Sequence, residues 1–177
     1  MKRNRKNQKG FSLIELLIVV AIILIIAAIA IPSLLQARMA AHEAAAAGAI
    51  SATKSAEAAY YTAYPSIGYS PDIASLGGPV PCTPSSTTAC LIDSALSAAV
   101  PGSSGKSGYF FLATGVQTGG AVINTAYVIG AAPMVVHSSA NRDFCSTNDG
   151  VLRSQMGSVG DVPVSNLPSC IAFPVAQ

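Results

Sequence analysis

A stretch of 21 almost wholly apolar residues near the start of the chain, residues 11–31, limits what the chain can fold into. As a helix it would be roughly 31 Å long, which is close to the hydrocarbon thickness of a bilayer. Its one charged side chain is Glu15. Because an ionised acid at the centre of a membrane helix costs roughly 2.5–3.5 kcal/mol on insertion scales, we expect Glu15 to have a role other than insertion.

The basic charge of the chain is concentrated ahead of this segment. Residues 1–10 hold five of the ten Lys and Arg residues and no acid, so the rest of the chain has five basic and eight acidic residues, a balance of −3. Positive charge ahead of an apolar segment keeps the N-terminus in the cytoplasm and sends the following part across the membrane. The overall charge of +2 therefore indicates topology, and we predict no nucleic-acid partner.

Three interpretations of the apolar segment compete. It could be a secretory signal peptide cleaved after Ala30, because residues 28–30 have the small-x-small pattern of a cleavage site. It could be a plain transmembrane anchor, or a retained helix whose leader is cut just before Phe11. Two features favour the last interpretation. Glu15 interrupts a run that is continuously apolar in signal peptides, and the helical pattern continues through Pro32 to about Tyr64.

Residues 9–20 (KGFSLIELLIVV) closely resemble the processing site of type IV pilins and their relatives. The resemblance implies that a membrane peptidase cuts after Gly10 and N-methylates Phe11. It also matches Glu15 to the glutamate of that family and Pro32 to its helix-kinking proline. The motif covers about the first 35 residues, and the likeness beyond them is one of architecture.

The implied fold is α+β and ladle-shaped, with a long N-terminal helix packed on a small antiparallel sheet. Residues 1–10 are expected to be the leader peptide, and residues 11–31 the hydrophobic transmembrane and assembly part of the helix. Residues 32–64 would continue that helix in amphipathic form, with a kink or local melt near residues 28–32 because proline removes a helical hydrogen bond. Residues 65–177 would form the globular head.

The charge of Glu15 fits the assembly model of that family. Cleavage would leave a positive α-amine on Phe11, four residues before the acid. Two unit charges about 4 Å apart gain about 4 kcal/mol at an effective dielectric constant near 20, which is comparable with the cost of placing the acid in an apolar region. We therefore expect Glu15 of one subunit to pair with the α-amine of a neighbour and to set the register between them.

The alanine-rich part of the helix has one face that should receive the head. The residues that share this face at a period of 3.6 are Ala46, Ile50, Thr53, Tyr60 and Tyr64. The tyrosines near the end of the helix are expected to pack against the loop that follows. His42 has no partner at ligand spacing and is predicted to be a surface residue.

The composition changes at Pro65, where a long connection rich in Gly, Ser and Pro begins. Strand-like runs follow at residues 109–114, 121–132 and 151–153, and a short helix is expected at residues 91–100. Gly119-Gly120 marks a hairpin turn, and Asn148-Asp149-Gly150 marks another turn. These signals predict a three- or four-stranded antiparallel sheet whose apolar face covers the helix.

Four cysteines lie after the membrane segment, where an exported chain meets an oxidising compartment: Cys82, Cys90, Cys145 and Cys170. Four cysteines allow three pairings. Proximity in sequence favours joining the first two and the last two. The second of these bridges would resemble the C-terminal disulfide loop of many pilins.

No motif of a hydrolase, a zinc protease or a phosphate-binding loop is present, and we predict no enzyme, no cofactor and no metal site. No two cysteines have the close spacing of paired zinc ligands. A weaker alternative is calcium held by Asp143, Asp149 and Asp161, as in the major pseudopilins of type II secretion. Their spacing fits no EF-hand loop.

We therefore predict a structural subunit of a type IV pilus-like filament. The resemblance implies a helical homo-oligomer, a prepilin peptidase, membrane lipid before assembly, and an inner-membrane assembly platform with its ATPase. The N-terminus would be cytoplasmic and the head periplasmic, until the subunit joins a pilus on the cell surface. The alternatives are a pseudopilin of a type II secretion system and, in a different class, a secreted periplasmic binding domain with a cleaved signal peptide.

Overall fold

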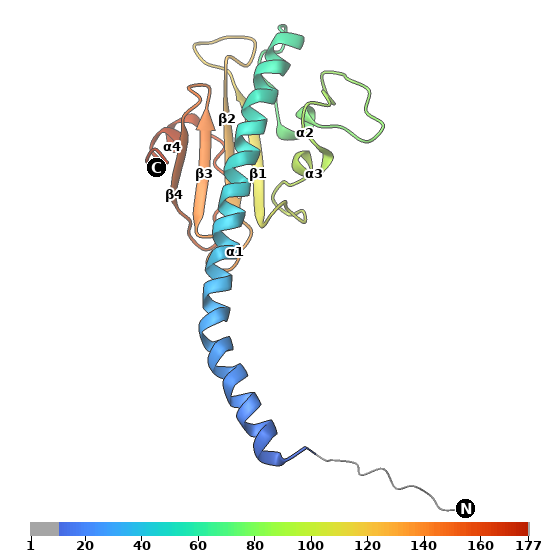
Figure 1. Ribbon diagram of the computed structural model, residues 1–177. Coiled ribbons are helices and arrows are strands. Elements are labelled where there is room, and N and C mark those ends of the chain that lie inside the picture. The colour runs from blue at the N-terminus through green and yellow to red at the C-terminus, as the bar shows by residue number, and fades with distance from the viewer. Residues whose placement is uncertain (1–10, 177) are drawn as a thin grey trace, which may run out of the picture. The chain divides into compact units, whose positions relative to one another are not determined.

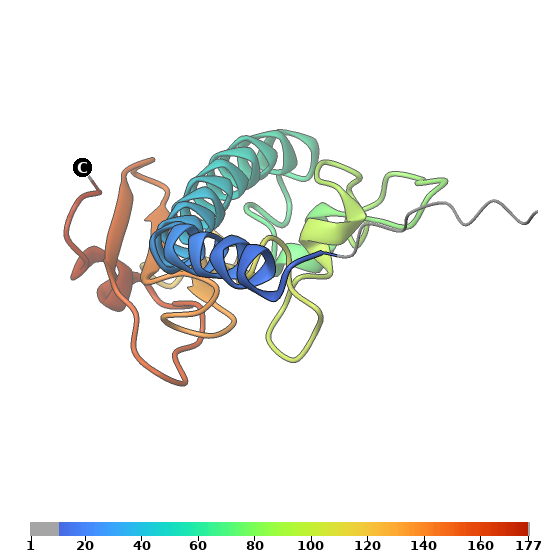
Figure 2. The same ribbon diagram turned by 60° about the horizontal axis from the view of Figure 1, so that its bottom comes forward.

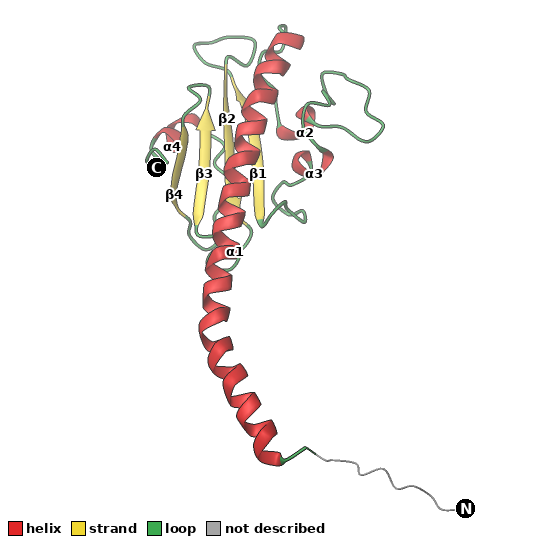
Figure 3. Ribbon diagram, viewed as in Figure 1, coloured by secondary structure: helices red, strands yellow, loops and turns green. Residues whose placement is uncertain are grey.

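The computed structural model describes residues 11–176, which fall into two compact units that meet between Ala37 and Arg38. The leader predicted at residues 1–10 lies outside the described residues. One helix, α1 (Leu13–Ala63), begins in the first unit, two residues after the first described residue, and continues into the second. The second unit adds three short helices and four strands (Figure 3).

Helix α1 stays helical through Pro32. Of the kink or local melt expected near residues 28–32, the melt is therefore absent, and the kink stays a prediction. Proline removes one backbone hydrogen bond, but the strong helix formers Ala30 and Leu34, two residues to either side, favour continuation of the helix. The helix also continues without a break through the alanine-rich part, as the sequence predicts.

The sheet has four antiparallel strands in sequential order: β1 (Tyr109–Val116), β2 (Ala126–Pro133), β3 (Arg142–Thr147) and β4 (Leu152–Met156). Each neighbouring pair forms a hairpin, with register pairs such as Phe111↔Ala131 between β1 and β2. Within the second unit, α1 runs across one face of this sheet (Figure 1). The predicted α+β fold, with a long N-terminal helix on a small antiparallel sheet, is thus confirmed.

Several boundaries differ from the sequence-based expectation. Strand β2 begins at Ala126 rather than at residue 121, because residues 117–125 form the β1–β2 loop and its turn at Gly119-Gly120. The helix expected at residues 91–100 is one turn, α3 (Ser94–Ser97), with Asp93 as its N-cap. Strand β3 was not predicted, and neither were α2 (Ile73–Leu76) and α4 (Leu167–Ile171).

The sheet is covered on both faces. On one face, Ile50 and Tyr60 of α1 pack with residues such as Phe111 and Ile129 in the main core. On the other face, Val128 packs in a smaller cluster with the segment that contains α4. All eight residues of β2 are therefore buried, which explains why this strand reads as an apolar run without alternation.

Both edges of the sheet are also occupied. The β1 edge receives the connection that carries α2 and α3, since the Phe111 amide donates to the Ala99 carbonyl at 2.7 Å. The β4 edge receives the C-terminal segment, since the Ser154 amide donates to the Pro174 carbonyl at 2.9 Å. Figure 2 shows these two segments at opposite ends of the sheet. Both edge strands therefore have part of their backbone paired within the described residues of the second unit.

Candidate assembly and processing site

Within residues 11–37, the described part of the first unit, α1 has no other element to pack against. Among residues 11–37 every side chain except Ala27 is exposed in the single chain, and Phe11 is 85% exposed. In the part of the chain that the structure describes, α1 is the one helix long and apolar enough to cross a membrane. An exposed apolar surface of this length is typical of a segment that is covered by lipid or by another apolar surface.

Glu15 caps the start of this helix in the single chain. Its Oε2 accepts a hydrogen bond of 2.9 Å from the backbone N–H of Ser12, and α1 begins at Leu13. A Ser at the N-cap with a Glu three residues later is the capping-box pattern. Sequence reasoning missed this bond, although the Ser-x-x-Glu spacing of residues 12–15 signals it. The Glu15 carboxylate therefore already accepts a hydrogen bond within the single chain.

Of the other residues expected to act in processing and assembly, Phe11 and Pro32 are described and Gly10 lies outside the described residues. Phe11 precedes the first helical residue, so its backbone nitrogen is not within the helix. Pro32 lies inside α1, where Ala30, Ile31, Leu34 and Ala37 line a shallow apolar depression.

The second unit holds its part of α1 by polar contacts that the sequence did not indicate. Nδ1 of His42 lies 2.8 Å from the Ser139 carbonyl oxygen, and Glu43 Oε1 accepts from the Asn141 amide at 3.0 Å. Glu43 Oε2 also lies 3.9 Å from Arg142 Nε. The prediction that His42 is a simple surface residue is wrong, because it is half-buried against the β2–β3 loop.

A buried acid, Glu57, lies between Thr53 and Tyr60 on the same face of α1. Glu57 is fully buried, and its carboxylate accepts two hydrogen bonds from Ser70, from the hydroxyl at 2.6 Å and from the backbone amide at 2.9 Å. Burial raises the pKa of Glu57 to about 7, and the two bonds from Ser70 oppose that rise. The acid thereby ties the helix to the connection that leaves it.

The tyrosines at the end of α1 pack as the sequence predicts, against the loop that follows. The rings of Tyr60 and Tyr64 are 4.7 Å apart, and those of Tyr61 and Tyr69 are 4.8 Å apart. Tyr69 in turn meets Tyr127 of β2 edge-on at 4.8 Å. These contacts give the cluster a packing role.

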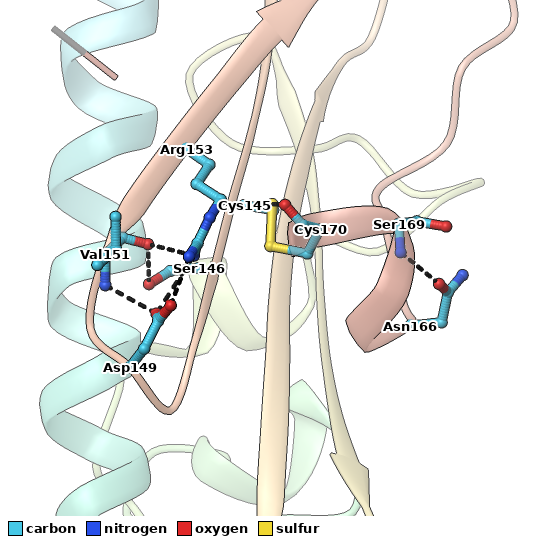
Figure 4. Close-up of a disulfide and its surroundings, with 8 residues drawn as sticks. All are labelled: Cys145, Ser146, Asp149, Val151, Arg153, Asn166, Ser169 and Cys170. Atoms are coloured by element: carbon cyan, nitrogen blue, oxygen red, sulfur yellow. Dashed lines mark hydrogen bonds and ion pairs between the residues drawn. A yellow bond between two sulfur atoms is a disulfide. The ribbon is translucent and has the colours of Figure 1, made fainter. Parts of the chain in front are cut away.

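The structure joins Cys82 to Cys90 and Cys145 to Cys170, with Cα–Cα distances of 6.0 and 5.8 Å. These are the pairs that proximity in sequence favours. The second bridge links the middle of β3 to α4 under full burial (Figure 4).

Beside the Cys145–Cys170 bridge, the Arg153 guanidinium donates to the Asp149 carboxylate, with Nη2 2.5 Å from Oδ2. This contact lowers the pKa of Asp149 to about 2. Asp149 is therefore engaged with a cation of its own chain. Asp143 lies on β3, whereas Asp149 and Asp161 lie in the segments that follow β3 and β4, and the three do not gather at one site. Within residues 11–176, no three His, Cys, Asp or Glu side chains gather where they could hold a metal ion.

The first unit is thus an exposed apolar helix with one acid at its start. The second unit contains two disulfide bonds. Residues 5–31 match the family model described as the prokaryotic N-terminal methylation motif, which is the signature of type IV pilins and pseudopilins. No curated protein and no solved structure shows significant similarity to this chain. The motif supports a type IV pilin-like or pseudopilin subunit anchored in a membrane, and proteins with this motif are structural rather than catalytic.

Proposed function

We propose that this chain is the structural subunit of a type IV pilus-like filament. It is made as a membrane-anchored precursor, cut between Gly10 and Phe11 by a prepilin peptidase, and methylated at Phe11. The observation that carries the proposal is the methylation motif at residues 5–31, which leads into a helix whose apolar surface is exposed all round. Polymerisation through that helix would bury this surface.

Glu15 is the residue that we assign to registration between subunits. In the single chain its carboxylate accepts from the Ser12 amide. In the filament it would also face the α-amine of Phe11 from a neighbour, which exists only after cleavage. At roughly 4 Å this ion pair gains about 4 kcal/mol at an effective dielectric constant near 20. A carboxylate has room for both donors, because it has about four lone-pair sites.

Each part of the chain has its own role in this proposal. Residues 1–10 act as leader, residues 11–31 as anchor and assembly helix with Pro32 at its end, and residues 32–64 as the helix that carries the head. The head, residues 65–177, is held by its two disulfides. The partners that follow are like subunits, the peptidase, membrane lipid, and an inner-membrane platform with its ATPase. The head would be periplasmic before assembly and on the cell surface afterwards.

The test combines the mass of the mature N-terminus with imaging of the cell surface. A mature chain that begins with methylated Phe11, in surface filaments that contain this subunit, is the expected result. A mature chain that begins at Ile31 would overturn the proposal in favour of a secreted binding domain. Methylated Phe11 without surface filaments, together with a secretion defect in a strain lacking the chain, would instead identify a pseudopilin of type II secretion.

A further inference from the structure

One end of the second unit exposes apolar side chains that its core does not use. Val135 in the β2–β3 loop is 59% exposed, Met156 at the end of β4 is 62% exposed, and Val159 in the segment after β4 is 90% exposed. None of the three belongs to either buried cluster. Single apolar residues are ordinary on a protein surface, so the position that these three share is what carries an argument. We call the three residues the apolar end surface.

The loops that carry the apolar end surface touch one another at the same end of the sheet (Figure 1). The Gly157 amide donates to the Asn141 carbonyl at 2.9 Å, and a Cβ built on Gly157 would lie 3.4 Å from Val136 Cγ2. The segment after β4 therefore lies against the β2–β3 loop. That loop also meets α1, because His42 Nδ1 lies 2.8 Å from the Ser139 carbonyl oxygen.

The two valines are held at the surface by the turns in which they lie. The Ser158 amide donates to Asp161 Oδ2, and the Asp161 amide donates to the Ser158 carbonyl at 3.1 Å, so that Val159 lies within a closed turn. The Val135 amide donates to Ser139 Oγ at 3.1 Å, and its carbonyl accepts from the Ser139 amide at 2.8 Å. Such turns ordinarily hold glycine, proline, asparagine, aspartate or serine. Valine in both of them indicates a surface that is covered by something other than water.

The chain brings this end of the second unit close to the membrane segment. The second unit begins at Arg38, directly after the apolar part of α1, and the helix continues there without a break. His42, which meets the β2–β3 loop, follows Arg38 by four residues. At 1.5 Å per residue this is roughly 6 Å along the helix. The apolar end surface is thus continuous along the chain with the segment that spans a bilayer.

The charged groups at this end are paired, so the surface is apolar rather than basic. Arg142 lies 3.9 Å from Glu43 of α1, and Lys106 forms an ion pair with Asp93 at 2.6 Å. A surface of this kind suits the boundary between lipid headgroups and acyl chains, where apolar side chains are buried and polar backbone stays hydrated. It offers little to an anionic headgroup alone.

We propose that the apolar end surface lies in the headgroup–acyl boundary of the bilayer while the subunit is anchored, as a second lipid contact beside the spanning helix. The inference rests on the membrane-anchored precursor of the proposed function. Val159, the most exposed of the three, is the side chain that enters the lipid. Extraction of the subunit from the membrane would then have to uncover this surface as well as the apolar helix.

The test places a tryptophan at one position of the full chain, which has none of its own, in phosphatidylcholine vesicles. Val159→Trp probes the surface. Val122→Trp is the matched control, because Val122 is 91% exposed in the β1–β2 loop at the opposite end of the sheet. Lipids brominated near the top of their acyl chains should quench Val159→Trp emission by roughly half, since such surfaces sink about 5–10 Å into this boundary. Val122→Trp emission should stay unquenched.

A second substitution asks whether the surface itself makes the contact. In the Val159→Trp chain, Val135→Asp should lower the quenching at least twofold, and Val122→Asp should leave it unchanged. The proposal is overturned if Val159→Trp is quenched no more than Val122→Trp, or if Val135→Asp has no effect. Blue-shifted emission without quenching would also overturn it, because another copy of the chain would then cover the surface. So would quenching that appears only with added phosphatidylglycerol, because the contact would then be electrostatic.

Flotation of the vesicles separates failure of this inference from failure of the proposed function. A chain that floats with the vesicles while Val159→Trp stays unquenched overturns the lipid contact of the second unit and leaves the membrane anchor intact. A chain that the floating vesicles leave behind overturns the anchor itself, and the inference falls with it.

Discussion

Glu15 combines two roles that one substitution can separate. Its carboxylate accepts from the Ser12 amide in the single chain, and its charge is what we assign to pairing with a neighbour. Glu15→Gln keeps the side-chain oxygen that caps the helix but removes the charge. We expect normal membrane insertion and at least a tenfold fall in filament yield, measured from sheared surface filaments, because every contact between subunits would lose the proposed ion pair.

Glu15→Asp is one control, because it keeps the negative charge on a side chain that is shorter by one methylene. Glu15→Ala removes both the charge and the hydrogen-bond acceptor that caps the helix. The expected order of filament yield is wild type, then Glu15→Asp, with the Gln and Ala variants lowest and similar. Wild-type yield from Glu15→Gln would show that the cap rather than the charge matters, and the registration role would have to be abandoned.

Gly130 of β2 is required by the close approach of another backbone. A Cβ on this residue would lie 2.2 Å from the Val164 carbonyl oxygen and 2.5 Å from the Val164 nitrogen. These are main-chain atoms of the layer behind the sheet and cannot rotate away. We expect Gly130→Ala to lower the unfolding free energy by about 3 kcal/mol, at the upper end of overpacking costs, in denaturant titrations of the full chain in micelles.

Gly48→Ala is the matched change for that experiment. Gly48 lies in α1, and a Cβ there meets nothing within 4 Å. Alanine at an unhindered helical site stabilises by roughly 0.5–1 kcal/mol relative to glycine. The two variants should therefore change stability in opposite directions, and equal losses would contradict the packing argument at Gly130.

Single residues also show where sequence reasoning reaches its limit. The period of 3.6 placed five residues on the buried face: Ala46, Ile50, Thr53, Tyr60 and Tyr64. The first four are buried, and Tyr64, which follows the last residue of α1, is half-buried. The same spacing also puts Glu57 on this face, but its charge argues against burial, which depends here on two donors from Ser70, thirteen residues further along the chain. A carboxylate on an alanine-rich helix reads as solvent-exposed until its partner in the fold is known.

At the scale of elements, strand β3 was the one part of the sheet that the sequence concealed. Five of its six residues are buried, and three of those five are the polar Asp143, Ser146 and Thr147. Alternation of apolar and polar residues therefore fails as a signal here. The flanking turn at residues 148–150 was recognisable, and so were β1 and β2, because they are apolar and separated by a glycine pair.

The two disulfides fasten different elements and should differ in their effect on stability. Cys145–Cys170 closes a separation of 25 residues and ties α4 to the middle of β3, whereas Cys82–Cys90 closes 8 residues within one loop. Chain entropy alone assigns about 3.5 and 2.5 kcal/mol to these closures. We expect the Cys145→Ala/Cys170→Ala variant to lose more unfolding free energy than Cys82→Ala/Cys90→Ala, by calorimetry or denaturant titration.

The two double variants can be compared directly, because each replaces two cysteines by two alanines. The gap should exceed the entropic difference, because Cys145 and Cys170 are both fully buried and their removal also leaves a cavity. Equal losses, or a larger loss in the loop variant, would show that the layer behind the sheet does not depend on its covalent link.

At the scale of the whole molecule, the buried acids place the stability maximum on the acidic side. Glu57 and Asp143 both have pKa values raised to about 7, chiefly by burial. As pH rises from about 4 to 7, the unfolded chain releases these protons while the folded chain retains them. The free energy of unfolding therefore falls over this range and levels off above it. Below pH 4 the opposite case of Asp149 applies, because its pKa is lowered to about 2 by Arg153 and its contribution is lost as it becomes protonated.

We therefore expect the unfolding free energy of the second unit to be greatest near pH 4 and to fall towards pH 7, with on the order of 3 kcal/mol from Glu57 alone. Glu57→Gln tests this share. Its amide group can still accept from the Ser70 backbone and donate to the Ser70 hydroxyl, while it no longer titrates. The fall between pH 4 and 7, followed by denaturant titration at each pH, should shrink in this variant, and the variant should be more stable than wild type at pH 8. An unchanged slope would show that Glu57 is ionised throughout and that its bonds from Ser70 outweigh the cost of its burial.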